Sequence, residues 1–295
     1  MSLKPRVVVV HRQTEFDELV ARHGTPGQAA FFLSTRGRSM EEVKRRHELT
    51  TESLGEVAAA IPPDWRRGRV ERGDLSRFAF DPGDVVVVVG QDGLVANVAK
   101  YLDGQVVIGI DPEPGRNAGV LVRHAPGEAA GLLHRAIRAN PASDHLTMVT
   151  ASSDDGQTLT ALNEVFLGHP SHQSARYALV CEMGTEHQSS SGVLVGTGTG
   201  ATGWLASVAR ERASAPGMPG PADAALCWFV REAWPSRATG TSLTSGRLEA
   251  GEKLALVAET DGLVVFGDGI EADALTLRWG QRVEVRVSDR ALRLI

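Results

Sequence analysis

Five consecutive valines, Val85–Val89, narrow the folds open to this chain more than any other feature. A strand with one face in water alternates apolar and polar residues, whereas Asp84–Val89 has no polar face. The run therefore predicts a strand buried on both faces of a parallel sheet. A turn at 90–93, a helical pattern at about Leu94–Leu102 and a second apolar run, Gln105–Ile110, complete a strand–turn–helix–strand unit.

Helix-capping signals add further elements to this half of the chain. The run Val7–Val10 is strand-like, and Thr14 and Asp17 after it have the spacing of a capping box. Ser39 opens a longer pattern whose apolar residues lie roughly on one face and which ends before a Pro-Pro pair. This alternation of strands and helices predicts an α/β domain over residues 1–141.

The pattern changes after Asn140-Pro141, where we expect the domain boundary. Strand-like segments then follow one another, interrupted by one helix at about Ala201–Arg210. This predicts an all-β domain over residues 142–295. The expected strands are Leu146–Ser152, Thr158–Gly168, Ala175–Cys181, Gly192–Val195, Leu226–Arg231, Lys253–Glu259, Leu263–Phe266, Gln281–Val287 and Leu292–Ile295.

Charge and composition argue against several classes of partner. The chain has 295 residues and a formal net charge of −5, which gives no general attraction to nucleic acid or to an anionic membrane. Its apolar runs are too short for a signal-peptide core or a bilayer span. Two cysteines, Cys181 and Cys227, are too few for a disulfide framework. We therefore expect a cytoplasmic protein that binds any anionic ligand through a local arrangement of groups.

The turn Gly90-Gln91-Asp92-Gly93 follows a predicted strand and precedes a predicted helix, where α/β sheets bind ligands. Glycines allow a phosphate to approach the backbone, and free N–H groups at a helix start attract anions. A carboxylate there repels phosphate unless a metal ion or a hydroxyl lies between them, so Asp92 suits a general base or a magnesium organiser. The alternative is an ordinary turn in which Asp92 caps the helix.

Asn163 and Glu164 form a polar pair inside an apolar segment. Buried amide and carboxyl groups are costly unless they are hydrogen-bonded, so the pair could bind ribose hydroxyls or an amide of a ligand. The alternative is a pair at a strand end that faces water.

A loop rich in glycine and threonine, Thr197–Gly203, lies between a predicted strand and a predicted helix. Such a loop can gather backbone N–H groups and short hydroxyls around a flat polar ligand, and Trp204 could add a stacking surface. A flexible loop is the alternative.

These three motifs, in this order, resemble the ATP-dependent NAD kinase family, in which a GGDG turn, an NE pair and a TPTGSTAY-like loop recur. The mitochondrial-type branch is the more similar, and the resemblance runs from about Arg46 to Ile295. Further segments that resemble this branch are Gly109–Pro114 with Arg116, Ser174–Tyr177, Gln188–Gly192, Phe229–Glu232 and Gly267-Asp268-Gly269.

The resemblance implies a Rossmann-like α/β domain followed by a β-sandwich. It implies transfer of the γ-phosphate of ATP to the 2′-hydroxyl of the adenosine ribose of NAD, giving NADP. Mg²⁺ would accompany ATP, and a homodimer or higher homo-oligomer is expected, with no nucleic acid or membrane partner.

Residue roles follow from the same resemblance, position by position. Asp92 would be catalytic, and Gly90, Gln91 and Gly93 would lie near the ATP phosphates. No residue is assigned to a metal ion. NAD would be bound by Asn163, Glu164, Ser191, Thr197, Thr199, Gly200, Thr202, Trp204 and Ser207.

The chain departs from the family pattern at Gln91, where a second glycine is usual, and at Leu94, where threonine is usual. If Gln91 took the left-handed backbone that glycine tolerates, it would be strained, and otherwise the turn must differ. These departures leave open a catalytically impaired NAD-binding regulatory protein of the same fold. A second alternative is a lipid kinase of the diacylglycerol or sphingosine type, a group that shares a GGDG-like turn.

Overall fold

The computed structural model describes residues 4–116, 119–138, 141–212 and 214–295. Contacts within the chain divide it into a first unit, Met1–Ser143 with Arg293–Ile295, and a second unit, Asp144–Leu292. The domain boundary expected at 141/142 stays a prediction, and Asn140 of the expected break lies outside the described residues. The last three residues belong to the first unit, whereas the sequence analysis placed them in the second.

A parallel sheet forms the centre of the first unit, with strand order β2-β1-β3-β4 and residues 293–294 of β16 beside β4. All six residues of β3 are buried, which confirms the strand predicted from the valine run. The strands are β1 (Arg6–His11), β2 (Arg66–Glu71), β3 (Asp84–Val89) and β4 (Val106–Ile110).

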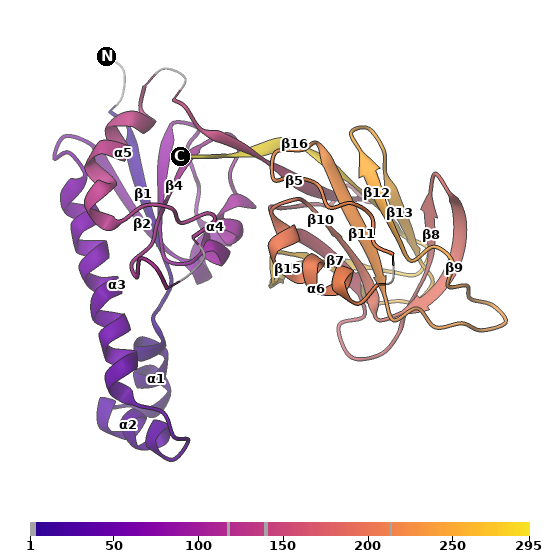
Figure 1. Cartoon of the computed structure of the whole chain (residues 1–295), viewed down its shortest axis with the longest axis horizontal. Coiled ribbons are helices and arrows are strands. Elements are labelled where there is room, and N and C mark those ends of the chain that lie inside the picture. Colours follow the sequence, from indigo (N-terminus) through magenta and orange to yellow (C-terminus); the bar gives the residue numbers. More distant parts are fainter. Residues whose placement is uncertain (1–3, 117–118, 139–140, 213) are drawn as a thin grey trace. The chain divides into compact units, whose positions relative to one another are not determined.

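Helices cover both faces of this sheet (Figure 1). One face buries Val85, Val87 and Val89 against residues of α3 and α5, and α4 lies on the other side. The helices are α1 (Glu15–His23), α2 (Pro26–Ser34), α3 (Met40–Ala60), α4 (Asp92–Ala99) and α5 (Ala129–Ala136), with 3-10 helices η1 (Arg72–Arg77) and η2 (Pro126–Glu128).

Local sequence accounts for where several of these helices begin. Thr14 and Asp17 form the expected capping box of α1, and Ser39 caps α3 as predicted. The helix α2 was not predicted, although Thr25 caps it and Pro26 occupies its first turn. Its apolar residues show little periodicity, so the pattern that identified the other helices was absent.

The second unit is a sandwich of two layers of strands. One layer, with order β9-β8-β13-β16-β5-β6, belongs to the same 10-stranded sheet as β2-β1-β3-β4, because β16 also pairs with β4. The other is a separate antiparallel sheet with order β12-β11-β10-β7-β14-β15. The elements are β5 (Asp144–Ser153), β6 (Thr158–Ala161), β7 (Glu164–Gly168), β8 (Ala175–Cys181), β9 (Gly184–Ser190), β10 (Gly192–Gly196), η3 (Gly200–Thr202), α6 (Trp204–Arg210), β11 (Ala225–Arg231), β12 (Ser245–Glu249), β13 (Leu254–Ala258), β14 (Leu263–Gly267), β15 (Ile270–Leu277) and β16 (Arg282–Leu294).

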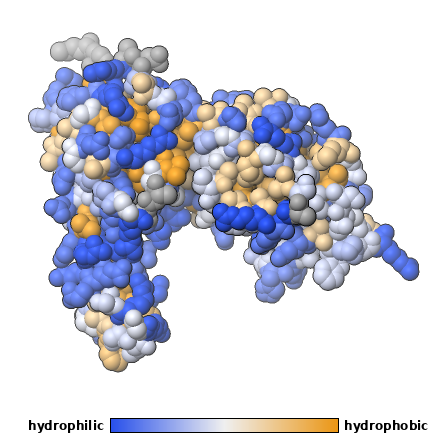
Figure 2. All heavy atoms as spheres, in the orientation of Figure 1, coloured by the Kyte–Doolittle hydropathy of each residue, from blue (hydrophilic) through white to orange (hydrophobic). Residues whose placement is uncertain are grey.

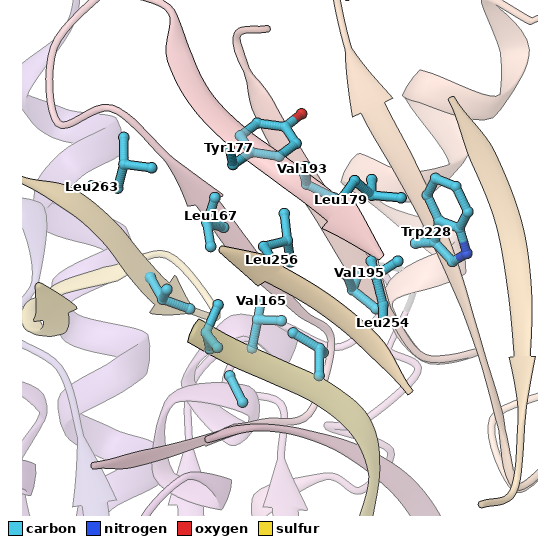
Figure 3. Packing of buried hydrophobic residues seen from close by; sticks show 14 of the residues in the cluster. Val165, Leu167, Tyr177, Leu179, Val193, Val195, Trp228, Leu254, Leu256 and Leu263 are labelled. Carbon is cyan, nitrogen blue, oxygen red and sulfur yellow. The ribbon is translucent and has the colours of Figure 1, made fainter. Parts of the chain in front are cut away.

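The two sheets share one apolar core, in which Leu179, Leu254 and Leu256 of one sheet meet Val165 and Val195 of the other (Figure 3). The outer face of the β7–β10–β11 sheet carries a second, smaller cluster, which α6 covers. An all-β sandwich with one helix was expected, and the structure has this arrangement.

Three predictions for the second unit differ from the structure. The two strands expected at Gln281–Val287 and Leu292–Ile295 form one strand, β16. The single strand expected over Thr158–Gly168 is wrong, because β6 and β7 belong to different sheets and the chain crosses between them at Leu162-Asn163. The helix expected at 201–210 is interrupted by Gly203, whose φ of −120° and ψ of −119° lie outside helical values, so that η3 precedes α6.

The surface in view is mostly hydrophilic, with apolar residues in separate groups (Figure 2). Among the described residues, no helix has the length and apolar character needed to cross a membrane.

Candidate functional site

The turn 90–93 lies at the edge of the first unit's sheet where a ligand site is expected. The chain leaves β1 for β2 on one side and returns to β3 on the other side of β1, so the strand order reverses between β1 and β3. In open α/β sheets, ligands bind beyond the carboxyl ends of the strands at such a reversal. The turn follows the carboxyl end of β3 directly, and Gly90 N donates a hydrogen bond to Ile110 O at 3.1 Å.

The turn itself is unstrained. Gln91 is the N-cap of α4 and has extended backbone, with φ −106° and ψ 164°. Neither Gly90 nor Gly93 has a positive φ. Gln91 therefore does not have the strained left-handed backbone that was considered. The other possibility holds, namely a turn that differs from the glycine-type turn. The helix begins at Asp92 rather than at Leu94, so Asp92 and Gly93 lie in its first turn.

Asp92 binds the backbone of a segment far along the chain. Its Oδ2 accepts a hydrogen bond from Val120 N at 3.0 Å, and its Oδ1 accepts from Leu121 N at 2.8 Å and Val122 N at 2.9 Å. A carboxylate offers about four acceptor positions, so roughly one remains on Asp92. Asp92 is partly exposed, which leaves that position open to a ligand.

We call residues 119–124 the strap. It lies against β4, where His124 N donates to Gly109 O at 3.3 Å and Asp111 N donates to His124 O at 2.9 Å. A Cβ on Gly109 would lie 2.0 Å from Leu121 O, so only glycine permits this approach. The strap was not predicted, although Gly109 inside an apolar strand is a signal of close backbone approach.

In the second unit, Asn163 and Glu164 lie where the chain crosses from one sheet to the other. Both residues are partly exposed, and within the part of the chain that the structure describes neither side chain makes a hydrogen bond. This position is the strand end that was considered as the alternative. The Glu164 carboxyl group also lies beside the Gly/Thr loop, since a Cβ on Gly200 would be 3.1 Å from its Oε2. The side chains are thus available to bind a ligand.

Glu164 has an unusual protonation equilibrium. Burial, which disfavours the ionised carboxylate, and the nearby negative charge of Asp268 raise the pKa of Glu164 to about 8. At pH 7 Glu164 is therefore mainly protonated, and its carboxyl group can donate a hydrogen bond as well as accept one.

Thr197 joins the Gly/Thr loop to the Asn163–Glu164 crossover. Its Oγ1 donates to Leu162 O at 2.6 Å, and its backbone N donates to Asn163 O at 2.9 Å. The same Oγ1 accepts from Thr199 N at 3.1 Å. Thr197 is fully buried, so in this structure it holds the loop in place.

The glycines of the loop permit close packing of backbone on backbone. A Cβ on Gly200 would lie 2.4 Å from Asn163 O, and a Cβ on Gly198 would lie 2.2 Å from the backbone of Gly220. The loop is therefore packed tightly against its neighbours, unlike the flexible loop considered as an alternative. Beside it, Thr199 is buried, and its Oγ1 has no hydrogen-bond partner among the described residues.

The other predicted ligand residues are placed less closely together. Trp204 packs on Phe166 with ring centroids 5.4 Å apart, and the Arg231 guanidinium lies 5.4 Å from its ring centroid. Thr202 and Ser207 are exposed on η3 and α6. Ser191 precedes β10, whereas the Gly/Thr loop follows it, so the five-residue strand separates Ser191 from the loop.

In the described ranges, no three His, Cys, Asp or Glu residues are arranged as a metal site. Mg²⁺ in phosphotransferases is commonly held by one or two carboxylates together with substrate phosphates. The remaining acceptor position of Asp92 fits that kind of binding.

The chain is similar to NAD kinase 2, mitochondrial, of Rattus norvegicus, with 25% identity over 261 residues. The similarity covers 71% of this chain and 61% of that protein, so this chain spans less than two thirds of the relative's length. No protein-family model matches the chain.

Proposed function

We propose that this chain is an NAD kinase, which transfers the γ-phosphate of ATP to the 2′-hydroxyl of the adenosine ribose of NAD. One observation supports this most directly. The Asn163–Glu164 crossover packs against the Gly/Thr loop, and both motifs recur in NAD kinases in this order. The similarity to a rat NAD kinase also supports the proposal.

Roles for the chain's own residues follow from their chemistry. The Asn163 amide can both donate to and accept from the adenosine half of NAD, and protonated Glu164 can donate to it. The unpartnered hydroxyl of buried Thr199 can satisfy a further polar atom of the ligand. Asp92 would orient or deprotonate the ribose hydroxyl through its remaining acceptor position.

Mg²⁺ would neutralise the charge of the ATP phosphates during transfer. It would arrive with ATP, with at most one protein ligand from Asp92. A rigid N–H array at the start of α4 would contact the same phosphates, and the exposed amide of Gln91 could donate to them. A cytoplasmic location and a homo-oligomer are further parts of the proposal.

An NAD-binding regulatory protein without kinase activity is the second candidate. One observation favours it, namely the three peptide N–H groups that occupy most of the Asp92 carboxylate. In that case Asp92 only fixes the strap. We favour the kinase because the turn is unstrained and one acceptor position of Asp92 stays open.

The substitution Asp92→Asn tests whether Asp92 takes part in the proposed transfer. We expect NADP formation to fall about 10²–10⁴-fold, because an amide cannot accept the ribose proton. NAD affinity, measured by calorimetry on the same preparation, should change little. Asp74→Asn, an exposed aspartate of η1, is the matched control and should retain full activity. Near wild-type turnover of Asp92→Asn would assign Asp92 to the strap alone.

A further inference from the structure

The β14–β15 hairpin turns through two residues, Asp268 and Gly269. Gly267 pairs with Ile270, and the φ angles of the two central residues are 52° and 67°. Positive φ at both positions defines a type I′ turn, for which Asn-Gly is as suitable as Asp-Gly. The turn alone therefore does not account for a carboxylate at this position.

The Asp268 carboxylate binds the crossover of the candidate site. Its Oδ2 accepts from Leu162 N at 2.7 Å, and its Oδ1 accepts from Asn163 N at 2.8 Å and Glu164 N at 3.3 Å. Asp268 N in turn donates to Glu164 O at 3.1 Å. Asp268 is only 8% exposed, so these bonds form in a site with little competing water.

The crossover is thus held from two sides. Asp268 receives the N–H groups of three successive residues, and Thr197 donates to the carbonyl oxygens of Leu162 and Asn163. The backbone groups of the crossover are satisfied in this way. In the described part of the chain, the side chains of Asn163 and Glu164 make no hydrogen bonds, so they are available to a ligand.

We propose that Asp268 is a positioning residue of the candidate site, whose carboxylate fixes the crossover so that Asn163 and Glu164 meet the ligand together. This inference rests on the proposed NAD site. It adds a residue on a distant hairpin to the pair and to the Gly/Thr loop.

The charge of Asp268 has a second effect on the same site. With burial, it keeps Glu164 protonated at neutral pH, at a pKa of about 8. Asp268 is the charged group that acts on Glu164 from the β14–β15 turn. The residues Thr197–Gly200, packed on the other side of the crossover, carry no titratable side chain.

Two substitutions in the full chain separate geometry from charge. Asp268→Asn keeps the turn and one acceptor oxygen but removes the charge, whereas Asp268→Glu keeps the charge and displaces the oxygens. Asp261→Asn is the control, because Asp261 is an exposed turn residue whose Oδ1 accepts one hydrogen bond, from Trp279 N at 2.8 Å. The readouts are the ¹³C NMR titration of the Glu164 carboxyl, assigned with Glu164→Gln, NAD affinity by calorimetry, and the melting temperature.

For Asp268→Asn we expect the Glu164 titration midpoint to fall below its wild-type value and the pH profile of NAD binding to move down with it. Each Asp268 substitution should weaken NAD binding about tenfold, since the crossover loses hydrogen bonds. For Asp268→Glu the midpoint should stay raised. Asp261→Asn should leave all readouts unchanged.

An unchanged Glu164 midpoint together with unchanged NAD affinity, whatever happens to the melting temperature, would show that Asp268 only stabilises the hairpin. If Asp268→Asn does not fold, the test uses Asp268→Glu, and an unchanged NAD affinity of that variant would contradict the positioning role of Asp268. A wild-type protein that binds no NAD would overturn the proposed function alone, because the Glu164 titration is read without ligand and still tests Asp268.

Discussion

Two aspartates in different units use their carboxylates in the same way. Asp92 accepts hydrogen bonds from residues 120–122, and Asp268 accepts from residues 162–164. Three successive peptide N–H groups that no strand or helix satisfies form a concave donor array, which suits an anion. At both places the side chain fixes a backbone segment beside residues proposed to bind ligand, so fold and function depend on the same bonds.

Glu164 gives a pH-dependent prediction at the scale of one residue. Its pKa in the folded protein, about 8, lies above the ordinary value of 4.5 expected on unfolding. Between these pH values the folded state holds the extra proton, so the free energy of unfolding should fall as pH rises from about 5 to 8. Glu164→Gln keeps the uncharged form at every pH. We therefore expect this variant to match wild type near pH 4 and to be more stable above pH 8.

Urea unfolding at several pH values between 4 and 9 measures this difference. Glu52→Gln, an exposed residue of α3, is the control and should follow the wild-type curve. Parallel curves for wild type and Glu164→Gln would show that Glu164 ionises normally.

The sequence predicted the position of Asp92 but not its bonds. Residues 84–93 contain enough local signal to place the turn after a buried strand. The partners of Asp92 lie 28 to 30 residues further along, and no local pattern indicates such a contact. For Gln91, the sequence left open a strained glycine-type turn or a different turn. The structure has the different turn, because the helix starts at Asp92 and an extended backbone accommodates the Cβ of Gln91.

At the scale of elements, the strap depends on Gly109. A Cβ 2.0 Å from Leu121 O cannot be accommodated unless the strap moves, and Asp92 would then lose its donors. We expect Gly109→Ala to lower the free energy of unfolding by about 1–3 kcal/mol, as overpacking commonly does. Activity should fall as well, because Asp92 loses its fixed orientation.

The control for this prediction is Gly131→Ala. Gly131 lies within α5, and a Cβ there meets nothing within 4 Å. This substitution should raise stability by about 0.5–1 kcal/mol, because alanine favours a helix. Urea unfolding measures both variants. Equal stability of Gly109→Ala and wild type would mean that the strap does not pack on β4 as described.

Elements with a strong local signal in the sequence were predicted, and polar or irregular elements were not. The valines of β3 and the capping box of α1 are local signals, and the structure confirms both elements. Strand β9, Gly184–Ser190, was missed because its residues are mostly polar; its pairing with β8 decides its conformation. The break between β6 and β7 was also missed. Both strands are apolar, and they differ only in the sheet to which each one pairs.

At the scale of the whole molecule, the chain ends in the unit where it began. Leu294 is buried and pairs with Val107 of β4, and Ile295 joins the core of the first unit. We expect Leu294→Ala to destabilise the first unit by about 2–5 kcal/mol, because it leaves a cavity. Arg293→Ala, at a partly exposed position, should cost less than about 1 kcal/mol.

Hydrogen exchange at the β4 amides measures this effect within the first unit. Exchange as slow in Leu294→Ala as in wild type would contradict the assignment of residues 293–295 to this core. The pairing of residues 293–294 with β4 could not be predicted from the sequence, because an apolar run of this kind resembles any other strand and only pairing with a distant segment fixes its partner.

The proposed kinase activity has one direct test. Purified wild-type protein is incubated with NAD, ATP and Mg²⁺, and NADP is measured with an NADP-specific dehydrogenase, with NAD affinity determined by calorimetry on the same preparation. We expect NADP to form, and to form only when ATP and a divalent cation are both present. If the preparation binds NAD yet forms no NADP with ATP and Mg²⁺ present, the chain is the NAD-binding protein of the second candidate and the kinase proposal is wrong.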